Sequence, residues 1–159
     1  MNALVIYDSK FGNTETIANA IATSLGARSL NIADATPAHV SGIDLLIVGS
    51  PTQGGRPTPA VHAYLRELPA GALATIDVAA FDTRIDSGRH GPFLRVLTSV
   101  IGFAAGKIGA DLKARGGKLV APPEGFIVDD TEGPLRAGEE QRAGAWAATL
   151  RSATRVKAA

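Results

Sequence analysis

Short apolar runs alternate along this chain with segments whose apolar residues recur at helical spacing, and this alternation limits the folds it can adopt. The strand-like runs are Ala3–Tyr7, Ile43–Val48, Ile76–Phe81 and Lys118–Ala121, with a weaker one near Ser29–Ile32. Strands separated by helices pair in parallel through right-handed crossovers, and the helices cover both faces of the sheet. We therefore expect an α/β fold with five parallel strands and five helical segments.

Helical segments are indicated by apolar residues three and four positions apart. The clearest sets are Ile17, Ile21 and Leu25; Val61, Tyr64, Leu65 and Leu68; Ile101, Ala104, Ala105, Ile108 and Leu112; and Leu135, Ala143, Trp146 and Leu150. Arg84–Gly102 exceeds what simple alternation requires, and we expect it to form a loop and a short extra helix that covers part of a ligand site or forms a partner surface. The alternative is a helix packed permanently on the core.

Composition narrows the class of protein. The chain has 159 residues, 45% hydrophobic and 19% charged, which suits one domain spanning residues 1–159. Its formal net charge of +1 is too small to attract the whole molecule to nucleic acid or to a membrane surface. The absence of cysteine excludes disulfides and thiolate nucleophiles. No apolar stretch approaches the roughly 20 residues of a membrane helix, and no signal segment opens the chain, so we expect a cytoplasmic protein.

The loop Ser9–Thr14 connects the first strand-like run to the first helical segment. Backbone N–H groups at a helix N-terminus lack intrahelical acceptors and lie at the positive end of the helix dipole, which suits a phosphate. Ser9 and Thr14 add hydroxyl donors, and Gly12 allows close approach. The alternative is that Asn13 or Thr14 merely caps the helix and nothing binds.

Two further loops are expected at the same edge of the sheet, where ligands of open α/β sheets bind. Gly49–Pro57 follows the third strand and is rich in glycine and proline, so it can lie against a flat heterocycle. A plain connection is the other reading, although such loops usually run about 2–6 residues. Phe81–Arg84 ends the fourth strand.

These motifs resemble the flavodoxins. Ser9, Gly12, Asn13 and Thr14 match a phosphate loop of the pattern Ser-x-Thr-Gly-Asn-Thr, with Phe11 in place of its threonine. Gly49-Ser50-Pro51-Thr52-Gln53-Gly54-Gly55 is similar to the run Gly-Ser-Pro-Thr-Tyr-Gly-Gly, with Gln53 in place of tyrosine. Asp44 and the segment Gly125–Leu135 also look like this family. The resemblance implies a flavodoxin-like three-layer sandwich, a five-stranded parallel sheet in the order 2-1-3-4-5.

The resemblance also implies non-covalently bound FMN and electron transfer. The phosphate would lie in the first loop and the isoalloxazine ring between the second and third. The cofactor residues implied in this way are Ser9, Lys10, Phe11, Gly12, Asn13, Thr14, Pro51, Thr52, Gln53, Gly54, Asp82, Thr83 and Arg84. No side chain is expected to act as acid or base, because the flavin supplies the redox chemistry. The partner would be a redox protein or a small quinone-like acceptor.

The second loop departs from the family because it holds no aromatic residue to stack on the flavin. Stacking contributes about 1–3 kcal/mol per ring in comparable systems, so we expect weaker FMN binding. Phe11 and Phe93 are possible substitutes, although each is more typical of a core residue.

The sequence lacks the residues that several other classes of α/β protein need. A response regulator needs an aspartate where the third strand runs into Gly49–Pro51, and no Gly-x-Gly-x-x-Gly follows the first strand. His39, His62 and His90 show no metal-ligand spacing, and Asp129–Gly133 is more typical of a solvated turn than of a cation site. Two rivals stay open: an FMN-dependent quinone or NAD(P)H oxidoreductase, and a flavodoxin-like domain that has lost FMN and acts as a binding module.

Overall fold

The structure, a computed structural model, describes residues 1–86 and 102–158, with side chains up to Thr154. Its parallel sheet has the strand order β2-β1-β3-β4-β5, and β6 pairs with β4 beyond the end of β5. The strands are β1 (Ala3–Tyr7), β2 (Arg28–Asn31), β3 (Leu45–Pro51), β4 (Asp77–Ile85), β5 (Lys118–Leu119) and β6 (Glu124–Val128). The predicted flavodoxin-like α/β fold and strand order are confirmed.

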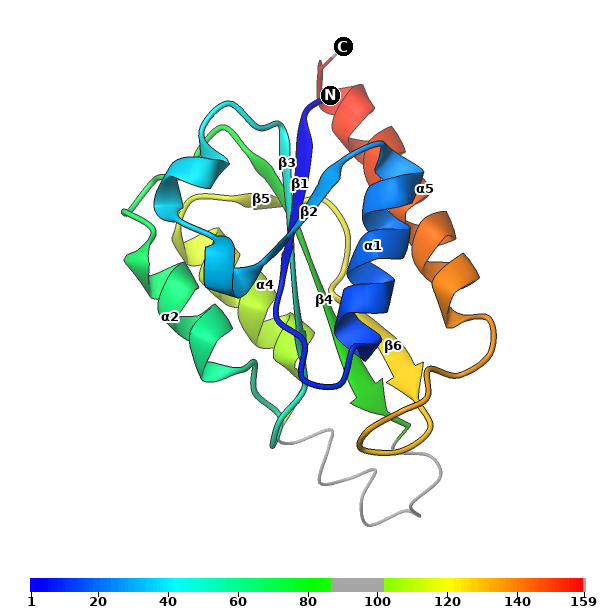
Figure 1. The fold of residues 1–159 in the computed structure, drawn as a ribbon. Helices are drawn as coiled ribbons and strands as arrows, with labels where there is room; N and C mark the ends of the chain where they lie inside the picture. Colours follow the sequence, from blue (N-terminus) through cyan, green and yellow to red (C-terminus); the bar gives the residue numbers. More distant parts are fainter. Residues whose placement is uncertain (87–101, 159) are drawn as a thin grey trace.

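Helices cover both faces of this sheet (Figure 1). The helices α1 (Asn13–Leu25) and α5 (Glu139–Ala158) lie on one face, and α2 (Pro59–Glu67) and α4 (Ala104–Ala114) lie on the other. Two short 3-10 helices, Ile32–Asp34 and Pro37–Val40, follow β2. The extra helix expected within Arg84–Gly102 lies almost wholly outside the described residues.

The alternation of side chains along the strands produces two cores. In β1, Leu4 and Ile6 join the core under α2 and α4, whereas Val5 and Tyr7 join the one under α1 and α5. All five residues of β1 are buried. This explains why the strand reads as one continuous apolar run rather than as an alternating one.

The sequence predicts one strand, Lys118–Ala121, beside β4, but the structure has two short strands there. β5 pairs with the start of β4 at Asp77 and Val78, and β6 pairs with the second half of β4 from Phe81 to Ile85. Pro122 and Pro123 lie between the two segments and have no N–H to donate to a ladder, which accounts for the break.

The final helix also begins later than its apolar pattern indicates. α5 starts at Glu139, and Leu135 instead forms an isolated bridge with Val128. Residues 129–138 are thus a connection between β6 and α5. This connection lies at the carboxyl edge of the sheet, beside the N-terminus of α1 (Figure 1).

Candidate functional site

The first loop folds around the hydroxyl of Ser9. Its Oγ accepts the backbone N–H of Gly12 at 3.1 Å and that of Glu15 at 3.3 Å. Gly12 precedes α1 with φ of 90°, a backbone conformation that glycine adopts readily. Ser9 therefore acts as a cap for two backbone donors, and within residues 1–86 and 102–158 its own hydroxyl hydrogen has no acceptor.

The first turn of α1 offers further donors. The Thr14 hydroxyl is buried and lies 2.7 Å from the Thr83 hydroxyl on β4, a pair that shares one hydrogen and leaves the other available. In the described part of the chain, no hydrogen bond takes up the backbone N–H of Asn13 or Thr14. These donors and the positive end of the helix dipole make this point attractive to an anion.

Asn13 joins the first loop to the turn after β6. Its Nδ2 donates to the backbone oxygen of Glu132 at 3.1 Å. The acidic turn at 129–133 is thereby fixed against the start of α1. The Asn13 side-chain amide is thus engaged with this turn.

The second loop is a tight hairpin after β3. Gln53 and Arg56 exchange backbone hydrogen bonds of 2.8 and 3.1 Å. Gly54 and Gly55 between them have φ of 57° and 76°. Positive φ at both central positions is the signature of a type I′ turn, which explains the two glycines.

The ends of β3 and β4 cap helix α4. The N-cap residue Phe103 makes no side-chain cap, and the first backbone donors of the helix bond elsewhere. Ala104 N–H donates to Thr52 Oγ1 at 3.0 Å, and Ala105 N–H donates to Asp82 Oδ2 at 2.8 Å. The second loop and α4 are therefore positioned as one unit.

Asp82 and Arg84, predicted to lie on a loop, are inside β4 and form a planar ion pair. Arg84 Nε and Nη2 donate to the two Asp82 oxygens at 2.6 and 2.8 Å. Asp82 is fully buried, whereas the Arg84 side chain is 20% exposed. The guanidinium lies 3.7 Å from the centre of the Phe103 ring, and a Cβ at Gly125 would fall 2.2 Å from Arg84 Cζ. The Asp82 carboxylate is thus engaged within the protein, and Arg84 presents the exposed edge of the pair.

A cavity of about 90 Å³ lies where these elements meet. Its lining includes many of the predicted residues: Lys10, Phe11, Asn13, Thr14, Pro51, Thr52, Thr83 and Arg84. Ser9, Gly12, Gln53, Gly54 and Asp82 are not among its lining residues. Sequence reasoning missed Ile85, Val128 and Thr131, which complete it. The sequence could have indicated Val128 and Thr131, because both lie in the segment Gly125–Leu135, which resembles the flavodoxins.

The aromatic residues around this cavity differ in their burial. Phe11 lines it and is 44% exposed, so it is not a core residue. Lys10 Nζ lies 5.4 Å from the Phe11 ring centre. Phe81 is fully buried and meets Phe126 edge-on at 6.1 Å. Phe93, the other predicted substitute, lies outside the described residues.

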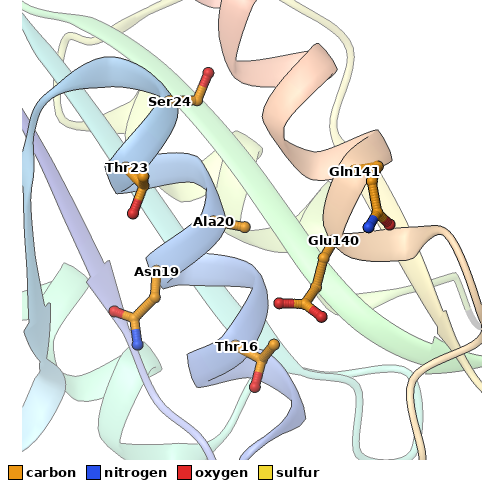
Figure 2. Close-up of a pocket in the computed structure, with 7 residues that line it drawn as sticks. All are labelled: Thr16, Asn19, Ala20, Thr23, Ser24, Glu140 and Gln141. Carbon is orange, nitrogen blue, oxygen red and sulfur yellow. The ribbon is translucent and has the colours of Figure 1, made fainter.

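A second, open hollow lies between α1 and α5 and has a volume of about 580 Å³ (Figure 2). It is lined by Thr16 and Asn19 of α1 and by Glu140 at the start of α5, among other residues. Among residues 1–86 and 102–158, no group of histidine, aspartate or glutamate side chains could hold a metal ion. No helix in the same residues is long and apolar enough to cross a membrane.

Solved structures share this fold at low sequence identity. Flavodoxin 2 from Bacillus cereus aligns with a TM-score of 0.73 at 22% identity, over 96% of this chain and 99% of that one. A flavodoxin from the domain Archaea aligns with a TM-score of 0.73 at 18% identity, over 98% and 99%. The rubredoxin oxygen:oxidoreductase from Desulfovibrio gigas aligns with a TM-score of 0.74 at 20% identity, over 99% of this chain and 37% of that one. The chain thus spans little more than a third of that oxidoreductase.

A search of curated proteins found no match. The family comparison is informative, because a family described as a flavodoxin domain matches residues 4–87, more than half of the chain. The matched region contains the first loop, Pro51 and Thr52, and the end of β4, which together supply most of the residues that line the cavity. The chain belongs to the flavodoxin domain family.

Proposed function

We propose that this protein binds FMN non-covalently at the cavity between α1, β3 and β4 and acts in electron transfer. The observation that carries the proposal is the convergence of the first loop, the second loop and the end of β4 on one cavity. When bound, the flavin supplies the redox chemistry, and the protein binds it and sets its environment.

The first loop fits the phosphate group of FMN. The backbone N–H groups of Asn13 and Thr14 and the hydroxyl of Ser9 are donors, and Lys10 adds a positive charge at the cavity. Gly12 keeps the loop in the conformation that gathers these donors. An anion at this place is stabilised by hydrogen bonds and by the dipole of α1.

The flavin ring would lie across the opening of the cavity. At about 90 Å³ the cavity is smaller than the roughly 300 Å³ at which small-molecule sites begin, so the described residues do not enclose a ring. Pro51, Thr52, Gln53 and Gly54 would line one side of it. Thr83 and the exposed edge of Arg84 would approach the other, with Asp82 holding Arg84 in place.

Phe11 is the side chain best placed to stack on the ring. It is a large, exposed aromatic residue at the rim of the cavity. Phe11 stands where the family pattern has threonine, so a hydroxyl that would donate to the phosphate is replaced by an aromatic ring. We expect this exchange to offset part of the binding lost with the aromatic-free second loop.

Titration of the apoprotein with FMN, followed by flavin fluorescence, tests the proposal. We expect saturable quenching, because the phosphate donors and the Phe11 surface are both present. Phe11→Ala should weaken binding by about tenfold, since one stacked ring contributes about 1–3 kcal/mol. The matched control is Phe11→Tyr, which keeps an aromatic ring at the same place and should bind FMN as the parent does.

The rival reading is a binding module without flavin, and the small volume of the cavity favours it. No saturable quenching at up to about millimolar FMN would contradict our proposal, because that concentration corresponds to only about 4 kcal/mol of binding. Equal FMN affinity in the Phe11→Ala variant would instead remove Phe11 from the proposed site.

A further inference from the structure

A separate cleft lies on the other side of the second loop. It has a volume of about 460 Å³ and is lined by Arg56, Pro57, Pro59, His62, Lys107 and Asp111. We name these residues the cationic cleft. Its volume falls in the roughly 300–1,000 Å³ range of small-molecule sites, unlike the cavity at the first loop.

The cationic cleft lies between the hairpin, the start of α2 and the outer face of α4. Lys107 Nζ donates to the backbone oxygen of Gly55 at 2.7 Å, which holds the lysine against the tip of the hairpin. An ammonium group has three donors, and the described residues take up one of them, which leaves two for a ligand. Arg56, at the end of the hairpin, is exposed. The lining of the cleft therefore includes two positively charged side chains, of which Lys107 is anchored to the hairpin.

The charges of the cleft do not cancel. Among residues 1–86 and 102–158, neither Arg56 nor Lys107 forms an ion pair with a carboxylate. Asp111, the one acidic residue of the lining, lies 3.7 Å from His62 Nδ1. Two cations therefore face the cleft against one carboxylate that already has a neighbour.

The chemistry of this lining selects an anion with a flat apolar part. The fork of an arginine matches two oxygens of a phosphate, and a lysine adds a mobile point charge. Pro57 and Pro59 offer apolar rings and have no N–H that would need a partner. A phosphate group near Arg56 and Lys107 with a ring against the prolines would satisfy all four residues.

We propose that the cationic cleft binds a small organic phosphate, held by Arg56 and Lys107. This site is distinct from the proposed FMN site, because Thr52 before the hairpin lines one cavity and Arg56 after it lines the other. The ligand would lie one hairpin away from the proposed flavin ring. The proposal does not depend on flavin binding.

Calorimetric titration of the full chain without added flavin tests it, with adenosine 2′,5′-bisphosphate as the probe. We expect saturable binding of this probe and no measurable binding of adenosine at the same concentration. Arg56→Gln and Lys107→Gln should each weaken binding by about tenfold or more, since each removes hydrogen bonds to a charged group. The matched controls are Arg66→Gln at the far end of α2 and Lys113→Gln at the far end of α4, which should bind as the parent does.

Three outcomes would overturn the proposal. Adenosine binding as tightly as the bisphosphate would show that the charges do not recognise the ligand. An equal loss of affinity in the control variants would indicate a general electrostatic effect rather than a site. Unchanged affinity in both Arg56→Gln and Lys107→Gln would show that these two charges do not hold the probe, while failure of FMN to bind leaves this test unaffected.

Discussion

At the scale of single residues, the buried hydroxyl pair of Thr14 and Thr83 separates phosphate binding from local stability. We predict that Thr14→Val weakens FMN by about 1.5–3 kcal/mol, because one hydrogen bond to a charged acceptor is lost. Affinity for riboflavin, which has no phosphate, should change little. Both affinities are measured by fluorescence titration of the same protein preparations.

Thr83→Val is the matched control for this prediction, since it breaks the same 2.7 Å contact from the β4 side. Both variants leave one buried hydroxyl without its partner, so each should lower the free energy of unfolding by about 1–3 kcal/mol. Only Thr14→Val should discriminate FMN from riboflavin. If Thr83→Val discriminates equally, the pair acts on the shape of the site rather than through the Thr14 hydroxyl.

Sequence reasoning at this scale identified which residues meet but not how they are engaged. The sequence indicates Thr14, Thr52 and Arg84 because parallel strands end at one edge, and all three line the cavity. It does not reveal that Thr52 caps α4, because that contact joins residues 52 positions apart. The Asp82–Arg84 ion pair could have been predicted, since residues two apart on a strand point to the same side of the sheet.

At the scale of elements, Glu139 connects the start of α5 to β6. Its Oε2 accepts the backbone N–H of Ile127 at 2.7 Å and a hydrogen bond from Arg142 at 2.7 Å. The hydrogen bond from Arg142 is the largest cause that holds the pKa of this carboxyl below its ordinary value of 4.5, and the Ile127 donor adds to it. A lowered pKa in the folded protein means that this group stabilises the fold above its ordinary pKa and loses that contribution as the pH falls through the folded value.

We therefore predict that Glu139→Gln lowers the free energy of unfolding by about 1.5–3 kcal/mol at pH 7, because the charge on the acceptor is lost. The difference from the parent should begin to shrink below about pH 4.5, where the Glu139 carboxyl of the unfolded chain takes up a proton, and should be lost once the pH falls below the lower pKa of the folded protein. Urea denaturation at pH 7, 5 and 3 measures it. The neighbouring Glu140 is exposed, so Glu140→Gln should show little change at any pH, and an equal effect there would contradict the role of the Glu139 contacts.

The elements that sequence patterns predicted best are those buried on both sides. β1 and β3 are nearly continuous apolar runs with their side chains divided between two cores, so their patterns are strong. β2 lies at the edge of the sheet and has no fully buried residue, which explains its weaker pattern. β6 was missed because only Phe126 and Val128 of its five residues are buried, and two prolines hide its continuity with β5.

At the scale of the whole molecule, the sheet couples the two cores. Leu46 and Ile47 are neighbours in β3 and contribute to opposite cores, so neither core can be lost without disturbing the strand that supplies the other. We therefore predict that residues 1–159 unfold in a single cooperative transition, as a one-domain chain should. The same argument applies to the carboxyl edge, where the cavity lies, because β1, β3 and β4 each place side chains in both cores.

Ligand binding should stabilise this cooperative unit as a whole. At FMN concentrations near 100 times the dissociation constant, the free energy of unfolding should rise by about 2.7 kcal/mol, because only the folded chain holds the phosphate donors in place. Scanning calorimetry with FMN, riboflavin and no ligand measures this, and at equal concentrations FMN should raise the transition temperature more than riboflavin. Two resolved transitions, of which FMN shifts only one, would show instead that the chain is divided into separate folding units and that the proposed site belongs to just one of them.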